Sequence, residues 1–324
     1  MNEIPAKSSG KKRPLPPAGT ALAPLPPLDG WTPYEQNAIH DIRTWVQRQP
    51  TRVDRAFELS GKPIEALMGR ALRNERAQAA FNNAIEGLLK LLNEWATAAA
   101  PGPPLDRYRK RGAQAEARED IATLDLGVVD KVAQPYYRKY VTGLAAEGAA
   151  AGGASILSPA AALVALAADV PAVVGGSLHA AASHQAAYGF DCANPKEKEI
   201  TMQLLFLSTE VTDAGKQVGL MAVYRAAAEL SGRTTWQQLE QQLLVRIIRK
   251  QGENVGVRVT QRKLGQILPA VGAVIGASFN AYYADKVCTA AYQTCRARFL
   301  ARKYGLQVEE IVGLASDKDQ GTSA

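Results

Sequence analysis

The sequence has few of the residues that usually carry covalent or metal chemistry. Its 324 residues include three histidines and three cysteines, and Cys192, Cys288 and Cys295 form no CxxC pair. An odd number of scattered cysteines argues against a disulfide scaffold or a zinc site and favours a reducing compartment. The GxSxG, HExxH, P-loop and GxGxxG motifs are also absent. We therefore expect no metal and no cofactor, and the sequence by itself identifies no reaction.

Aromatic residues are scarce as well, at 6% of the chain, and alanine is the dominant apolar residue. Alanine loses no side-chain entropy in a helix and offers little surface to a pleated sheet, so this composition favours helices over strands. We predict an all-α fold, a bundle of eight to eleven helices with two Gly/Ala-rich buried helical regions.

Charge is missing from three long windows. Between Glu147 and Asp191 the only charged residue is Asp169, which separates residues 148–168 from 170–190, and residues 264–284 form a third window. Each is about as long as a bilayer-spanning helix, although alanine and glycine insert poorly into lipid. The windows are either buried core helices or segments that meet a membrane.

The domain boundaries follow from proline and from capping signals. Residues 1–29 are basic and Pro-rich without an apolar signal-peptide core, which predicts a disordered tail and a cytoplasmic protein. Thr32, Pro33 and Glu35 form a capping box that should begin the first helix. We expect one helical domain over residues 30–305 and a C-terminal tail with a short helix over 306–324.

Further helices are expected from apolar periodicity. Amphipathic segments cover residues 51–71 and 77–99, and several helices should follow between 195 and 263. The glycines near Gly152 and Pro159 predict a break, after which Asp169 would cap a helix over residues 170–188. Asn194, Pro195 and Glu197 repeat the capping-box arrangement.

Glycines spaced four apart suggest close helix packing. In a helix Gly148 and Gly152 share a face, as do Gly272, Gly276 and Asn280, and each glycine costs about 1 kcal/mol relative to alanine. Such a cost normally has a packing reason, so the two regions should contact each other. A buried Asn280 would either tie two helices together or face a polar site.

Basic residues gather in two places, residues 107–111 and 233–263, within a net charge of +7. Both stretches suit an anionic surface or simple solubility. The anion-binding candidates are Arg107, Arg109, Lys110, Arg111, Arg246, Arg249, Lys250, Arg262 and Lys263.

An enzymatic site would have to draw on a short set of ionisable residues near the glycines. His179 and His184 are five residues apart, about 140° around a helix, so they do not present one metal-binding face. A buried carboxylate at a helix break is the first place to look for catalysis. The catalytic candidates are Glu147, Asp169, His179, His184 and Asp191.

Several short motifs in order resemble the EcsC family of bacterial proteins. They are Trp31–Glu35 with Trp45, AAEG at 145–148, Asp169–Pro171, YGFD at 188–191 and ILPAVGAVIGASFN at 267–280. The resemblance covers roughly residues 28–305, and its motif positions include Pro171, Tyr188 and Gly189. It implies a link to a locus that encodes an ABC transporter connected with secretion.

Three functional hypotheses remain open at this point. The first is a non-enzymatic helical protein attached to the inner face of the cell membrane, at an anionic lipid surface, as an accessory to transport or secretion. The second is a hydrolase with a carboxylate-based site at the Gly-rich helices. The third is a soluble scaffold. Exposed windows would favour the first, convergent carboxylates the second and complete burial the third.

Overall fold

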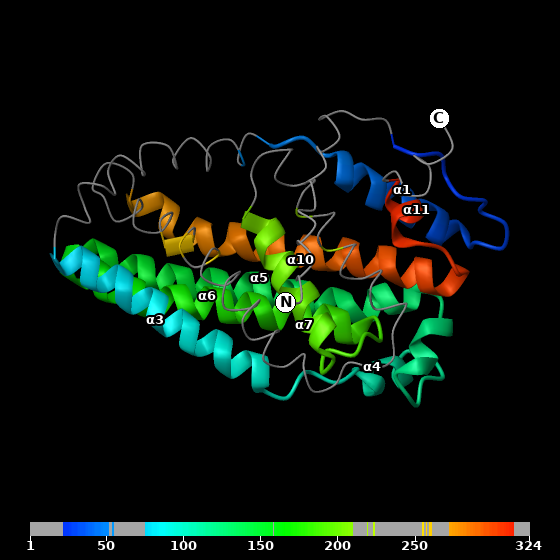
Figure 1. The fold of residues 1–324 in the computed structure, drawn as a ribbon, viewed down its shortest axis with the longest axis horizontal. Helices are drawn as coiled ribbons and strands as arrows, with labels where there is room; N and C mark the ends of the chain where they lie inside the picture. The colour runs from blue at the N-terminus through cyan, green and yellow to red at the C-terminus, as the bar shows by residue number, and fades with distance from the viewer. Residues whose placement is uncertain are drawn as a thin grey trace, which may run out of the picture.

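The computed structural model describes residues 22–51, 54, 75–157, 159–209, 219, 223, 255, 257, 259–260 and 272–313. Over these residues the chain forms eight α-helices and one 3-10 helix and no strand, which confirms the all-α prediction (Figure 1). Apart from residues 219, 223, 255, 257, 259 and 260, the helices predicted over residues 55–71 and 210–263 lie outside the described residues. The elements are α1 (Pro33–Gln47), α3 (Glu75–Thr97), α4 (Leu105–Arg109), η1 (Glu119–Thr123), α5 (Leu126–Leu157), α6 (Pro159–Ala187), α7 (Pro195–Thr209), α10 (Gly272–Tyr304) and α11 (Val308–Val312).

The first helix begins as its capping box predicts. The Thr32 side chain accepts the Glu35 backbone N–H at 3.3 Å, and the Glu35 carboxylate accepts the Thr32 N–H at 3.0 Å. Pro33 occupies the first helical position, where its missing N–H costs nothing. Two of the backbone donors at this helix start are therefore satisfied by side chains.

The helix break predicted near Gly152 and Pro159 is present between α5 and α6, but the helix start predicted at Asp169 is wrong. Gly152 lies inside α5, which continues to Leu157, so only one residue separates α5 from α6. Asp169 does not begin a helix, because α6 runs through Asp169 and Pro171 to Ala187. Pro171 removes one backbone hydrogen bond from α6, but its ring packs closely against α3. A Cβ on Gly87 of α3 would sit 3.2 Å from Pro171 Cγ. Packing against α3 overrides the local signal.

The four long helices α3, α5, α6 and α10 lie side by side in an elongated bundle (Figure 1). Going forward along α5, Tyr137 meets Asp285 and Gly148 meets Asn280, so α5 and α10 are antiparallel. Asn280 also meets Asp169, in the first half of α6. One end of the bundle therefore gathers the end of α5 and the starts of α3, α6 and α10. Around the opposite end pack α1, α4, η1 and α11.

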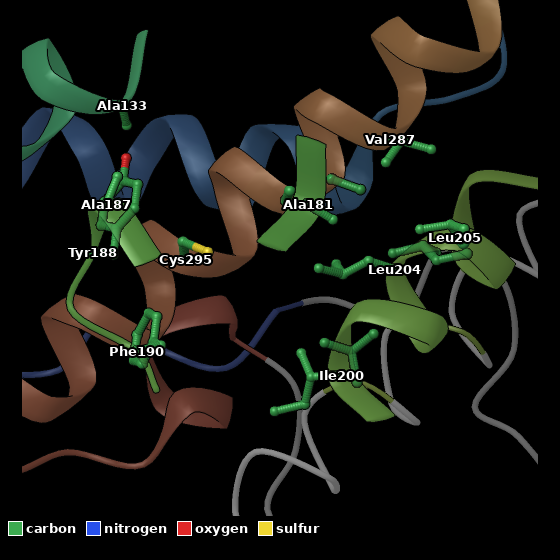
Figure 2. Packing of buried hydrophobic residues seen from close by; sticks show 14 of the residues in the cluster. Ala133, Ala181, Ala187, Tyr188, Phe190, Ile200, Leu204, Leu205, Val287 and Cys295 are labelled. Atoms are coloured by element: carbon green, nitrogen blue, oxygen red, sulfur yellow. The ribbon is translucent and has the colours of Figure 1, made fainter. Parts of the chain in front are cut away.

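The core between α6, α7 and α10 combines small and large side chains (Figure 2). Ala181 of α6 is fully buried beside Leu204 and Leu205 of α7 and Val287 of α10. Alanine on the central helix lets both neighbours approach closely, and leucine and valine then fill the space. The alanine-rich composition of the second uncharged window thus allows close helix packing in the core.

Candidate functional site

A buried carboxylate organises one end of the bundle. Asp130 of α5 is 4% exposed, and its oxygens accept hydrogen bonds from the hydroxyls of Tyr34 (2.7 Å), Tyr188 (2.5 Å) and Tyr292 (3.0 Å). Arg296 of α10 adds an ion pair, with Nε 3.1 Å from Asp130 Oδ2. The cluster joins α1, α5, the turn after α6, and α10. A buried carboxylate needs such partners, because without them the loss of hydration would make its charged form highly unfavourable.

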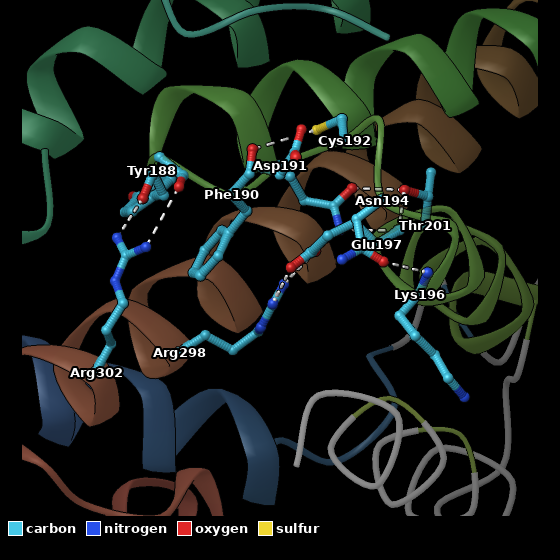
Figure 3. A network of polar contacts seen from close by, with 12 residues as sticks. Tyr188, Phe190, Asp191, Cys192, Asn194, Lys196, Glu197, Thr201, Arg298 and Arg302 are labelled. Carbon is cyan, nitrogen blue, oxygen red and sulfur yellow. Dashed lines mark hydrogen bonds and ion pairs between the residues drawn. The ribbon is translucent and has the colours of Figure 1, made fainter. Parts of the chain in front are cut away.

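The YGFD turn, residues 188–191, contacts the side chains of Arg298 and Arg302 of α10 (Figure 3). Arg302 donates to the Tyr188 carbonyl at 2.8 Å and to the Gly189 carbonyl at 3.3 Å. The Phe190 ring lies under the guanidinium groups of Arg298 and Arg302, at 3.8 and 4.9 Å. Gly189 has a φ of +75°, which glycine adopts without strain. The turn is thus fixed to the last turns of α10.

A second buried ion pair lies beside the turn (Figure 3). Glu197 of α7 receives two bonds from the Arg298 guanidinium, at 2.5 and 2.9 Å, and one from Gln185 of α6 at 3.0 Å. Asn194 does cap α7, since its Oδ1 accepts the Lys196 N–H at 2.9 Å. Glu197, however, faces Arg298 instead of closing the predicted capping box, because the bidentate pair is the stronger interaction.

The same end also closes α1 onto the C-terminal segment. Lys303 Nζ lies 2.8 Å from Glu35, so the capping residue of α1 is tied to α10. Arg43 donates to four backbone carbonyls, those of Ala23, Pro24, Glu310 and Ile311, at 2.7 to 3.1 Å. We call the region that contains the Asp130 cluster, the YGFD turn, the Glu197–Arg298 pair and Arg43 the charged end.

The electrostatics of the charged end favour a fixed charge pattern. Burial and the Asp130 charge raise the pKa of Tyr34 to about 12, and the same two causes raise the pKa of Tyr188 well above its ordinary value. Burial lowers the pKa of Arg298, but the Glu197 carboxylate outweighs it and the net shift is upward. Tyr34, Tyr188 and Arg298 therefore each keep one protonation state near neutral pH. None is tuned toward neutrality as a general acid or base would be.

The opposite end of the bundle has a different composition. No charged residue occurs in residues 148–157 of α5, 159–168 of α6 or 272–284 of α10. We call these three helix segments the uncharged end. The fourth long helix does bring charge there, since α3 starts with Glu75 and Arg76.

At the boundary of the uncharged end, three of the short sequence motifs named above contact one another. A Cβ on Gly148 of α5 would lie 2.7 Å from the Asn280 side chain of α10, closer than real Cβ atoms approach. The Asn280 amide donates to Asp169 Oδ1 of α6 at 3.0 Å. The expected contact between the two Gly-rich regions is thus present at Gly148, and Asn280 ties helices together. Gly272 and Gly276 lie on the same α10, although their side-chain surroundings are outside the described residues.

The five catalytic candidates have separate surroundings. Glu147 is exposed on α5, and Asp169 holds Asn280. His179 is exposed, whereas His184 is fully buried and its Nδ1 lies 2.7 Å from the Ala180 carbonyl. Asp191 forms a partly exposed ion pair with Arg118 at 2.9 Å. Among the described residues no group of three His, Cys, Asp or Glu side chains could hold a metal ion.

The basic run at residues 107–111 is mostly solvent-facing. Arg109, Lys110 and Arg111 are exposed, while Tyr108 in the middle of the run is fully buried and donates to the Ala187 carbonyl. Arg107 lies 4.4 Å from the Tyr136 ring centroid of α5. The run therefore borders the charged end. Arg246, Arg249, Lys250, Arg262 and Lys263 lie outside the described residues.

Sequence reasoning missed the carboxylates that organise the charged end. Asp130 is the single acid in an apolar helical stretch, LGVVDKVA, and its register with the buried Val129 and Val132 was the available signal. Glu197 follows Asn194 at the spacing of a capping box, so its local pattern predicts a cap and not an ion pair.

The fold and these contacts define a class, an all-α bundle tied at one end by a buried polar network. The profile of the EcsC protein family matches residues 36–300, and the chain belongs to this family. It is also similar to the "Uncharacterized protein YdbA" of Bacillus subtilis (strain 168), with 28% identity over 170 residues. That alignment covers 51% of this chain and 56% of the relative, so the chain spans about half the length of the protein it matches. No solved structure matches this chain significantly.

Proposed function

We propose that the protein is a non-enzymatic helical bundle that attaches peripherally to the inner face of the cell membrane through its uncharged end. The observation that supports this proposal most strongly is the segregation of charge along the bundle. Three helix segments that meet at one end carry no charged residue, whereas the ion pairs Asp130–Arg296 and Glu197–Arg298 lie toward the other. Asp54, which pairs with Lys286 and accepts a hydrogen bond from Tyr282, is a buried charge that borders the uncharged end. Lipid contact penalises charge, so such an end is suited to the interface.

The geometry makes this attachment shallow. Over the described residues no helix is both long enough and apolar enough to cross a bilayer. Alanine and glycine also bury less apolar area than leucine does, so each inserted residue contributes little free energy. We expect reversible binding, and the transport or secretion partner implied by the family resemblance would add a second contact.

The basic run contributes little to an end-on attachment. Arg107 packs on Tyr136, and α5 rises about 30 Å from Tyr136 to its last residue, Leu157. That separation is about four Debye lengths at physiological ionic strength. Exposed charges at residues 107–111 therefore act on a membrane only when the bundle lies flat.

Co-sedimentation with vesicles tests the proposal. The full chain should bind vesicles made of equal parts phosphatidylcholine and phosphatidylglycerol. A variant with Ala154→Glu and Ile156→Glu at the uncharged end should bind at least ten-fold more weakly. The matched control, Gln114→Glu with Thr123→Glu, adds the same charge at exposed positions near the charged end and should bind within two-fold of the original chain.

Two results would contradict the proposal. Equal loss of binding in both double variants would mean that net charge, not the uncharged end, controls attachment. Absence of binding to any vesicle would favour the scaffold hypothesis, which the burial of most of residues 170–190 already supports.

A further inference from the structure

A cavity of about 390 Å³ opens between α3, α6 and the start of α7. Its walls are mainly apolar and include Leu91 and Trp95 of α3 with Pro171, Ala172 and Gly175 of α6. This volume is within the range of small-molecule pockets, which bury a ligand against apolar walls and orient it with a few polar groups. No element of the proposed membrane attachment uses this cavity.

The principal charge in the cavity is Lys198 of α7. This residue is 8% exposed, and its ammonium group donates to the Ala96 carbonyl at 2.7 Å and the Ala98 carbonyl at 3.1 Å. An ammonium group has three N–H donors, so these two bonds leave one N–H without a carbonyl acceptor; the Trp95 ring centroid lies 5.8 Å from Nζ. Burial lowers the pKa of Lys198, which reflects how little water solvates this cation. A poorly solvated cation with a spare donor favours an anionic partner.

The remaining polar groups of the cavity restrict the charge and the chemical class of a ligand that could bind there. Cys192 donates to the Ala182 carbonyl at 3.2 Å, and burial raises the pKa of its thiol to about 12, so it stays protonated and unreactive. His179 stands exposed on the α6 wall. Glu94 is also exposed on the lining and would repel a second negative charge. The cavity therefore suits one negative charge and an apolar body, without covalent chemistry.

We propose that this cavity binds a small amphiphilic monoanion, such as a medium-chain carboxylate. The carboxylate accepts the spare N–H of Lys198, and the apolar chain lies against Trp95 and Leu91. Two features support this occupant: the apolar walls, and a nearly buried ammonium group at the base of α7.

Isothermal titration calorimetry of the full chain with sodium decanoate tests the proposal. Decanoate should bind saturably, and neutral 1-decanol, which has the same chain length, should bind at least ten-fold more weakly. Ala172→Trp fills the cavity from its exposed α6 wall and should weaken decanoate binding at least ten-fold. Ala146→Trp, at an exposed position on α5, is the matched control and should bind within two-fold of the original chain.

Two further variants separate the charge from the walls. Lys198→Met should lower the affinity for decanoate at least ten-fold, and a circular dichroism melt will establish whether it folds. If it does not fold, the Ala172→Trp comparison still decides. Trp95→Phe should keep the binding heat but remove most of the ligand-induced change in tryptophan fluorescence. No saturable decanoate heat, unchanged binding by Ala172→Trp, or equal affinity for 1-decanol would each overturn the proposal.

Discussion

The two ends of the bundle are held together by different physical means. At the charged end, Asp130 and Glu197 are buried with several donors each, and every contact requires a particular geometry. At the uncharged end, the contact between Gly148 and Asn280 depends on the absence of a side chain. The first end should therefore fail when a group is removed, and the second when a group is added.

The largest effect should come from Asp130→Ala at the charged end. The substitution leaves the buried Arg296 with only the exposed Asp41, 3.7 Å away, as a carboxylate partner and removes the acceptor shared by three tyrosine hydroxyls, which should cost about 3–5 kcal/mol of unfolding free energy. Urea denaturation measures the loss. The control is Asp106→Ala, whose side chain is 82% exposed in its ion pair with Arg109 and should change stability by less than about 1 kcal/mol. Similar losses in both variants would show that Asp130 is not a central tie.

Adding volume at Gly148 should have the next largest effect. Gly148→Leu would place a side chain where Asn280 stands, and overpacking of this kind costs about 1–3 kcal/mol. Gly143→Ala on the same helix meets nothing within 4 Å and should instead stabilise the protein by about 0.5–1 kcal/mol. Thermal melts of both variants measure the contrast. If Gly148→Leu melts at the same temperature as the original chain, the contact between residue 148 and Asn280 is not tight.

The all-α class could be predicted from the sequence because helix formation depends on local properties. Alanine content, the capping box at Thr32 and the stripe along α3 each act within a few residues. The sequence also indicated the Gly148 contact, since a glycine four residues from another has a cost that only close packing offsets.

The errors occurred where tertiary packing overrides a local signal. Asp169 before Pro171 resembles a helix start, but α3 packs on that proline ring and α6 continues. The role of Asp130 could not be predicted from the sequence because its four partners come from residues 34, 188, 292 and 296, and no local pattern connects positions so far apart.

A smaller effect should appear as a pH dependence from His184. Burial lowers the pKa of this side chain to about 4, opposed by its bond to the Ala180 carbonyl, while the unfolded chain has a pKa of about 6.5. As the pH falls the unfolded state binds the proton first, so stability is complete above pH 6.5 and declines between pH 6.5 and 4. The loss at pH 5 is about 2 kcal/mol.

Denaturation of His184→Phe checks the assignment. This variant should show a flatter dependence of unfolding free energy on pH between 6.5 and 4 than the original chain. His179→Phe, at an exposed position on the same helix, should keep the original slope. An unchanged slope in His184→Phe would mean that other groups cause the acid sensitivity.

The smallest effect should come from Asp191→Asn. Its partner Arg118 and Asp191 itself have side chains 33% and 44% exposed, so water screens their ion pair. We expect a loss of less than about 1 kcal/mol in urea denaturation. A loss as large as that of Asp130→Ala would mean that the exposed Asp191–Arg118 pair stabilises the fold as strongly as the buried Asp130 cluster does.

The difference between the two ends is tested most directly by an environment-sensitive fluorophore attached to single introduced cysteines. Ser155→Cys carries the label at the uncharged end and Gln114→Cys carries it near the charged end. The three native cysteines are buried, and burial raises the pKa of each thiol, so they should label slowly. With vesicles of equal phosphatidylcholine and phosphatidylglycerol, the account predicts a blue-shifted emission for the label at residue 155 and no shift at residue 114. A shift at residue 114 alone, or at neither residue, would contradict it.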